Sequence, residues 1–210
     1  MFTARFDRPA RIDAEASLRE AFGCERLYLV AGGSVTFSGV IALGPDVSFA
    51  GECHVADATR IDNGAILTDV RLGRGNAVRA YSVMSAVRAG DRNLFGPFCF
   101  IRDNCVVGDE CILGAHVEAA RSRFGSGTKI SHRAFVGDAE IGENTIIGAG
   151  VVFCNYDGQG RQKTAVGAGV TVGSGSLLVP PLAIGAGAIV AAGSTVTKDL
   201  PAGSKLIQKR

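Results

Sequence analysis

The stretch VGAGVTVGSGSLLVPPLAIGAGAIVAAGSTV, residues 166–196, repeats with a period of six. Its branched apolar residues recur at every sixth position: Val166, Val172, Leu178, Ile184, Val190 and Val196. An amphipathic helix would repeat its apolar face every 3.6 residues and a half-buried strand every two, so neither explains the pattern. A short flat strand followed by a turn explains it, because the branched residue then points inward once in every unit.

The same rhythm runs back, with slips, to Ile41, and mostly small residues fill the slot four places after each branched one. That slot holds Cys99, Cys105, Cys111, Thr128, Ala134, Thr145, Val170, Ser176, Ala188 and Ser194. Hexapeptide periods are a signature of the parallel β-helix, in which three short faces close one coil. The pattern resembles the hexapeptide-repeat class, whose β-helix is left-handed. We therefore expect an all-β, left-handed parallel β-helix over residues 37–200.

Residues 1–36 lack the repeat and are expected to form a capping segment, because stacked repeats need a cover at their ends. The run from Asp13 to Gly23 is predicted to be a short helix, with Asp13 capping its first amides and Gly23 closing it. Residues 27–30 are predicted to form a short strand. Residues 201–210 form a C-terminal tail in this division of the chain.

Composition excludes several classes of protein. The net charge of +2 is too small to indicate a nucleic-acid partner or binding to an anionic membrane. No run of 18 apolar residues occurs, and the first residues lack the apolar core of a signal peptide, so a cytoplasmic location is expected. Of the six cysteines, Cys99, Cys105 and Cys111 fall in the small inward slot and are expected to be buried, inert thiols.

The three histidines raise the possibility of a zinc site of the γ-carbonic-anhydrase type. Zinc needs three protein ligands that converge on one point. His116 and His132 are sixteen residues apart, near one coil, whereas His54 lies several coils away. No metal site is expected on that ligand geometry.

His132 falls two places after Ile130, in an outward slot that core packing does not require. It is either an ordinary surface histidine or a functional one. The insert that begins at Cys154 follows one coil later, so His132 and Asn155 are expected to share an edge of the prism. A neutral imidazole there is suited to take a proton from an amine or a hydroxyl near neutral pH.

Four segments resemble one acyltransferase family: Gly96-Pro-Phe, Val136-Gly-Asp-Ala-Glu-Ile-Gly-Glu-Asn, Ile147-Gly-Ala-Gly and Cys154-Asn-Tyr-Asp-Gly. They look like the acetyltransferase half of bifunctional N-acetylglucosamine-1-phosphate uridyltransferase/glucosamine-1-phosphate acetyltransferase. The resemblance covers roughly residues 40–200. It implies a homotrimer with active sites between prisms and acetyl-CoA as the acyl donor. The nucleotidyltransferase half has no counterpart in these residues, so uridylyl transfer is not expected.

The resemblance also implies roles for individual residues. His132 matches the catalytic base, Glu118 matches an acidic residue that supports it, and the Ala149 N–H matches a donor to the thioester oxygen. The acetyl-CoA contacts that it implies are Asn155, Tyr156, Ser174, Ala192 and, in a looser match, Lys209.

The acceptor side departs from the family. Arg102 matches an Arg that grips the sugar phosphate, and Arg161 stands where the family has Lys. Phe135 replaces a Tyr, Ile146 an Asn and Ala120 a phosphate-binding Lys. Because three polar contacts have become apolar, we expect a changed acceptor. The prediction is an acetyl-CoA-dependent N-acetyltransferase for an amino sugar or sugar phosphate. The alternatives are a different amine or nucleotide-sugar acceptor, or a catalytically inactive trimeric prism.

Overall fold

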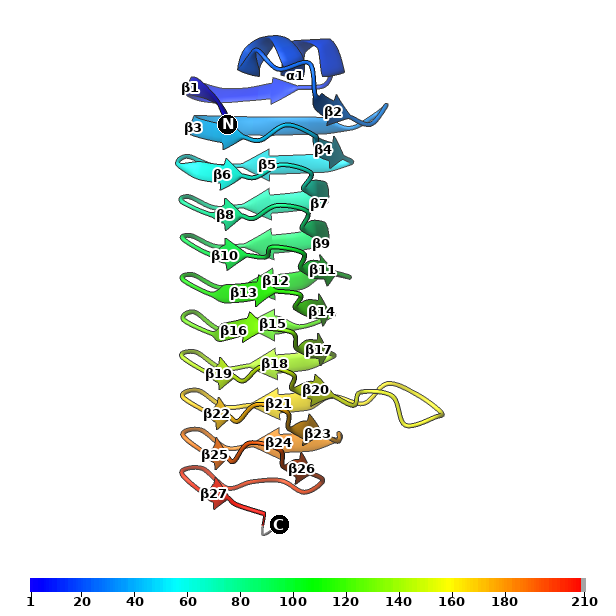
Figure 1. Cartoon of the computed structure of the whole chain (residues 1–210), viewed down its shortest axis with the longest axis vertical. Coiled ribbons are helices and arrows are strands. Elements are labelled where there is room, and N and C mark those ends of the chain that lie inside the picture. The colour runs from blue at the N-terminus through cyan, green and yellow to red at the C-terminus, as the bar shows by residue number, and fades with distance from the viewer. Residues whose placement is uncertain (209–210) are drawn as a thin grey trace.

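The computed structural model describes residues 1–208, which form an elongated solenoid of stacked coils with one short helix at its N-terminal end (Figure 1). The strands pair in three parallel ladders, one for each face, and successive coils lie directly above one another. The parallel β-helix expected from the six-residue rhythm is confirmed.

Face 1 consists of the second half of β3 (Ser34–Leu43), β6 (Thr59–Ile61), β8 (Ala77–Val78), β10 (Leu94–Phe95), β13 (Ile112–Ala115), β16 (Lys129–His132), β19 (Ile146–Ile147), β22 (Thr171–Val172), β25 (Ile189–Val190) and β27 (Lys205–Leu206). Face 2 consists of β2 (Leu27–Leu29), β4 (Val47–Ala50), the first parts of β7 (Ile66–Leu72) and β9 (Val83–Ala89), β11 (Phe100–Arg102), β14 (Glu118–Ala120), β17 (Phe135–Gly137), β20 (Val152–Phe153), β23 (Leu177–Leu178) and β26 (Thr195–Val196). Face 3 consists of the first half of β3, β5 (Glu52–Val55), the second parts of β7 and β9, β12 (Cys105–Val107), β15 (Arg123–Phe124), β18 (Ala139–Ile141), β21 (Thr164–Val166) and β24 (Leu182–Ile184).

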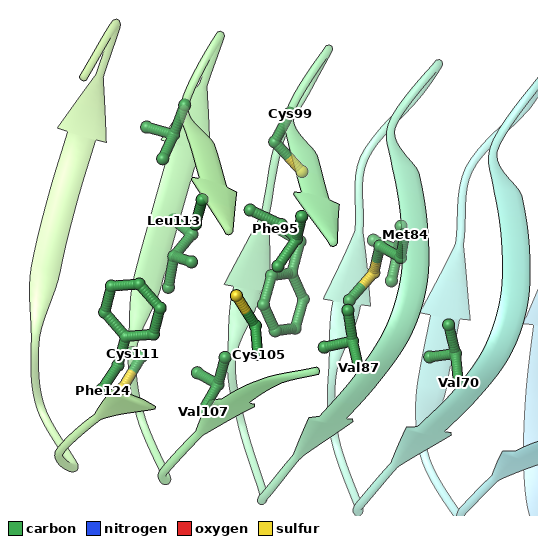
Figure 2. Close-up of a cluster of buried hydrophobic side chains, with 14 of the residues drawn as sticks. Val70, Met84, Val87, Phe95, Cys99, Cys105, Val107, Cys111, Leu113 and Phe124 are labelled. Carbon is green, nitrogen blue, oxygen red and sulfur yellow. The ribbon is translucent and has the colours of Figure 1, made fainter. Parts of the chain in front are cut away.

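The interior of the solenoid is filled by the residues that set the rhythm. All six branched residues of the 166–196 stretch are buried, and so are all ten residues of the small inward slot. Figure 2 shows the middle of this core, where cysteine sulfurs lie among apolar side chains of neighbouring coils. Burial raises the pKa of the Cys99 thiol to about 11. The prediction that Cys99, Cys105 and Cys111 are buried free thiols is confirmed.

The N-terminal segment contains a strand that the sequence analysis did not predict. β1 (Phe2–Ile12) pairs antiparallel with β3, whereas the pairings between the strands of the three faces are parallel. The α1 helix (Glu15–Phe22) packs beside it, and Phe22 joins Phe6 and Phe37 in an aromatic cluster with centroids 5.3–5.9 Å apart. This segment covers the first coil.

The helix ends as predicted but begins differently. Gly23 adopts the left-handed conformation, and N–H groups at this cap bond to the Arg19 and Glu20 carbonyls, so the predicted closure is confirmed. Capping by Asp13 is wrong: the N-cap is Ala14, with no side-chain hydrogen bond. β1 runs on to Ile12, which leaves only two residues to connect it to the helix.

The α1 helix is eight residues long, and in the described chain no helix has the length and apolarity needed to cross a membrane. The expected cytoplasmic location stays a prediction.

Candidate active site

The corner between faces 1 and 2, here called corner 1–2, places four of the predicted site residues in one line. Each lies two residues after the inward residue of a face 1 strand, and those inward residues are paired in register: Ile130 with Ile147, then Val172, then Val190. The line on successive coils is His132, Ala149, Ser174 and Ala192. We call it the corner column.

Close approach of the coils fixes this alignment. A Cβ on Gly148 would lie 2.5 Å from the Ser174 nitrogen, and one on Gly173 would lie 2.3 Å from the Ala192 nitrogen. Any side chain at these two glycines would therefore push the coils apart. The coils therefore pack backbone to backbone at the corner column. Apart from His132, the column carries only the small side chains of Ala149, Ser174 and Ala192.

Above His132 the corner column also presents hydrogen-bond donors. The N–H groups of Gly148 and Gly150 bond to the Val172 and Arg133 carbonyls, and the Ala149 carbonyl accepts a bond from Gly175. The Ala149 N–H, between these two glycines, takes no part in the backbone hydrogen bonds between coils. Among the described residues the backbone N–H groups of Ala149, Ser174 and Ala192 have no backbone acceptor. All three residues lie outside the strands and at the surface or close to it. A chain of amide donors beside an exposed imidazole can bind a ligand rich in carbonyl groups.

His132 ends β16 and is exposed to solvent, consistent with its outward slot. Within residues 1–208 its imidazole makes no hydrogen bond to another protein group. Glu118 is not its partner in this single chain, because Glu118 Oε1 instead accepts a hydrogen bond of 2.7 Å from Arg102 Nη2. Register places Glu118 under Phe135, three residues further along the coil than His132.

A ladder of alternating charges runs from Glu118, the first residue of β14 on face 2, across to the corner between faces 2 and 3. Arg102 bonds to Glu118 and, at 2.5 Å, to Asp103; Arg121 bonds to the same Asp103 oxygen at 2.7 Å. Arg121 then makes a forked pair with Asp138, at 2.7 and 3.1 Å. We call these five residues the charge ladder.

The ladder shifts the ionisation of its members. Burial by itself opposes the charged form of Asp138, but hydrogen bonds from Arg121 and Asn155 outweigh it and hold the pKa of Asp138 below its ordinary value. The hydrogen bond to Glu118 raises the pKa of Arg102, and the one to Asp138 raises that of Arg121. The pairs of the ladder therefore favour the charged forms of Asp138, Arg102 and Arg121.

The expected shared edge of His132 and Asn155 is wrong. Asn155 Nδ2 bonds to Asp138 Oδ2 at 2.5 Å, so Asn155 lies at the corner between faces 2 and 3, whereas His132 lies at corner 1–2. The strand of face 2 separates them. The insert is longer than a normal corner and leaves the prism only after β20 has crossed the face, which the sequence spacing does not disclose.

The insert, residues 154–163, projects from the prism as a loop after β20 (Figure 1). Tyr156 and Arg161 form an isolated antiparallel bridge that closes it, and Asp157 accepts hydrogen bonds from the Gln159 and Gly160 amides and the Gln162 side chain. Asn155 is buried and anchors the base of the loop. Tyr156 is 65% exposed, and its hydroxyl donates a hydrogen bond to the Gly158 carbonyl.

The remaining predicted acceptor residues are divided between two faces. Phe135 lies on face 2 directly above Glu118, while Ile146 lies on face 1 and is 47% exposed. Ala120 is fully buried on face 2. Lys209 lies outside the described residues.

Metal ligands do not gather in the described part of the chain: no group of three or more His, Cys, Asp or Glu is placed to hold an ion. His54 pairs with Glu52 at 2.8 Å, and His116 stacks on Phe98 with centroids 5.2 Å apart.

Asp103 and Asp138, which connect the charge ladder, escaped the sequence analysis. Their signal was available in the spacing, since Asp103, Arg121 and Asp138 are separated by 18 and 17 residues, about one coil each.

No model of a protein family matches the chain. Relatives nevertheless place it among the hexapeptide-repeat acyltransferases, a family to which the chain belongs by sequence and by its fold. It is homologous to the C-terminal region of the bifunctional protein GlmU. The GlmU of Synechococcus sp. (strain RCC307) is 38% identical over 167 residues, which is 78% of this chain and 36% of that protein. The GlmU of Acinetobacter baumannii (strain ACICU) is 39% identical over 168 residues, 80% of this chain and 37% of that protein.

The chain thus spans little more than a third of the length of these relatives. Among solved structures, an Arabidopsis UDP-N-acetylglucosamine acyltransferase is 16% identical, covering 85% of this chain and 68% of that chain, with a TM-score of 0.43.

Proposed function

We propose that the chain is an acetyl-CoA-dependent N-acetyltransferase whose acceptor is an amine on a sugar or a similar small molecule. The corner column is the observation that carries this proposal. It aligns an exposed imidazole with amide donors on the next three coils, an arrangement suited to an extended thioester ligand. The homology to the GlmU C-terminal region supports the same reaction class.

Direct transfer needs only groups that the corner column supplies. The pantetheine arm of acetyl-CoA lies along Ser174 and Ala192, with its thioester beside Ala149. The acceptor amine attacks the thioester carbonyl while His132 takes its proton, and the Ala149 N–H donates to the oxyanion that forms. Collapse of the tetrahedral intermediate breaks the C–S bond, and the departing thiolate regains a proton from the imidazolium. The products are the amide and CoA.

The site is completed by a second copy in this proposal, because Tyr156 and His132 stand at opposite ends of face 2 within one chain. The exposed side chains of the faces favour a homotrimer. Faces 1 and 2 present the apolar residues Phe100, Ile146, Leu177 and Ile189, each at least 40% exposed. Face 3 presents Glu52, Arg71, Arg88, Arg123 and Glu140. Faces 1 and 2 are therefore the ones that border the active-site groove and the neighbouring subunits, and the projecting loop brings Tyr156 to the corner column of the next subunit.

The test measures thiol release from acetyl-CoA with a panel of amino sugars, together with the mass of the assembly by analytical ultracentrifugation. Amine-dependent release by a species of three chains is expected. Tight acetyl-CoA binding without release for any amine would favour the inactive prism instead.

A further inference from the structure

The charge ladder on face 2 bears on what kind of acceptor the site takes, and this inference rests on the proposed function. In the family resembled by the sequence, the Arg at the position of Arg102 grips a phosphate. Here both arginines of the ladder are already paired. Arg102 uses Nη1 and Nη2 on Asp103 and Glu118, and its guanidinium lies 5.2 Å from the centre of the Phe100 ring.

Arg121 is bound at least as fully, because its Nε, Nη1 and Nη2 atoms all donate to Asp103 or Asp138. A guanidinium presents five N–H donors in one plane, and a phosphate would need to displace a carboxylate from that fork. Side-chain exposure of both arginines is only 28%, which strengthens the pairs relative to fully solvated ones.

The net charge of the ladder disfavours the binding of an anion. Three carboxylates, those of Glu118, Asp103 and Asp138, face two guanidinium groups, so the ladder carries a net charge of −1. The surface around it is apolar: Phe100 is 41% exposed, and Phe135 and Val152 continue the stripe upward. Of the two carboxylate oxygens of Glu118, Oε1 accepts the hydrogen bond from Arg102. The other oxygen has no hydrogen-bond partner among the described residues and is free on this surface.

We propose that the acceptor is an amine that carries no phosphate, recognised by the Glu118 carboxylate and the rings of Phe100 and Phe135, with Arg102 positioning Glu118. A dianionic group brought to face 2 meets like charge and no unpaired guanidinium, whereas an ammonium group or sugar hydroxyls meet an acceptor oxygen. Two cations outside the ladder, Arg133 at corner 1–2 and Arg161 in the loop, are the remaining candidates to hold a phosphate.

The experiment compares glucosamine with glucosamine-1-phosphate, which differ by the phosphate alone. The values of kcat/KM come from thiol release, and the Kd of each sugar comes from calorimetry in the presence of CoA. We expect kcat/KM to be about tenfold or more higher, and Kd about tenfold or more lower, for glucosamine than for glucosamine-1-phosphate.

A matched pair of variants tests whether the ladder is the cause. Asp103→Asn removes the shared carboxylate while keeping its size, and Asn tolerates the left-handed backbone at this position, where φ is 59°. It should shift the preference toward glucosamine-1-phosphate by about threefold or more. The control is Glu110→Gln, which neutralises the partner of Arg92 on a different corner and should leave the preference unchanged.

The possible failures are distinguishable. A preference of the unaltered chain for glucosamine-1-phosphate overturns the inference and leaves the acetyltransferase proposal standing; loss of that preference in Arg133→Ala or Arg161→Ala would show which cation holds the phosphate. If neither sugar is acetylated, the proposed function fails, and calorimetry still decides the inference, which tighter binding of the phosphorylated sugar would overturn. If neither sugar binds, face 2 is not an acceptor surface and the inference falls.

Discussion

The two ends of face 2 differ in how many of their polar groups are already hydrogen-bonded within the chain. At corner 1–2 the chain repeats small residues and glycines, which leaves unpaired amides beside one imidazole. Toward the opposite corner its charged side chains pair with one another, from Arg102 and its partner Glu118 on face 2 to Asp138 and the anchored Asn155 at the corner. The first end is open for a ligand and the second is closed by its own contacts. Residue type alone is therefore a poor guide to where a ligand binds, because an unpaired backbone amide is more available for binding than a paired arginine.

The sharpest way to break this comparison is to remove the imidazole from the open corner. His132→Ala should lower kcat/KM for acetyl transfer by about 10²–10⁴-fold, the range of general-base catalysis, because no other titratable side chain lies in the corner column. The melting temperature should not change, since the side chain is exposed. Steady-state thiol release and a thermal melt measure the two quantities. The matched control is His54→Ala on face 3, and an equal loss of rate in both variants would remove His132 from the mechanism.

Removing the centre of the closed corner should instead affect stability. Asp138 accepts bonds from Arg121 and Asn155, and its side chain is 13% exposed. Asp138→Ala should lower the free energy of unfolding by about 2 kcal/mol, a typical loss for hydrogen bonds to a charged group. The control is Glu110→Ala, whose exposed pair with Arg92 should contribute less than about 1 kcal/mol. Equal losses in urea titrations would contradict a special role of the closed corner.

The contribution of Asp138 to the free energy of unfolding should also depend on pH. The folded pKa of Asp138 lies below its unfolded value, so the folded state favours the charged form. Its contribution is fully present above the ordinary aspartate pKa of about 3.9 and is lost as the pH falls through the lower folded pKa. The stability difference between the unaltered chain and Asp138→Ala should be constant near neutral pH and shrink below about pH 4. A difference that grows in acid would show the opposite shift.

A larger side chain in the corner column should weaken the binding of acetyl-CoA without unfolding the chain. Ala192→Leu adds bulk to the end of the corner column and should raise the Kd for acetyl-CoA about tenfold, equivalent to ~1.4 kcal/mol. Ala183→Leu makes the same change at an exposed position of face 3 and should leave the Kd unaltered. Calorimetric titration of each variant with acetyl-CoA checks this. Unchanged binding in Ala192→Leu would place the donor elsewhere.

The smallest expected effect connects the two ends through a neighbouring subunit. Tyr156→Ala removes an exposed ring and should raise KM for acetyl-CoA roughly fivefold, about 1 kcal/mol of lost contact, with little change in stability. Mixing unfolded His132→Ala and Tyr156→Ala chains and refolding them together should restore part of the activity. Restoration occurs only if the two residues of one site come from different subunits. Mixtures that stay as weak as the separate variants would contradict the proposed arrangement of the loop.

The sequence determined the fold well because a period of six leaves few alternatives, and every inward position inferred from it is buried. The corner column followed from the same period. The β1 strand was not foreseen, although Phe2, Ala4 and Phe6 alternate with polar residues, because it lies outside the six-residue period and its pairing partner depends on tertiary structure. The shared edge of His132 and Asn155 failed for a related reason. A period shows which residues stack, whereas an insert can leave the prism from either end of a strand.

The antiparallel direction of β1 has a consequence for growth of the solenoid. A stack of parallel coils has unpaired backbone at each end and would otherwise serve as a template for head-to-tail fibres. At the N-terminal end an incoming coil would meet a strand running the opposite way, with Pro9 lacking an N–H and with Arg5, Asp7 and Arg8 exposed. The reversed strand, its proline and its exposed charges thus make the N-terminal end a poor template for a further parallel coil.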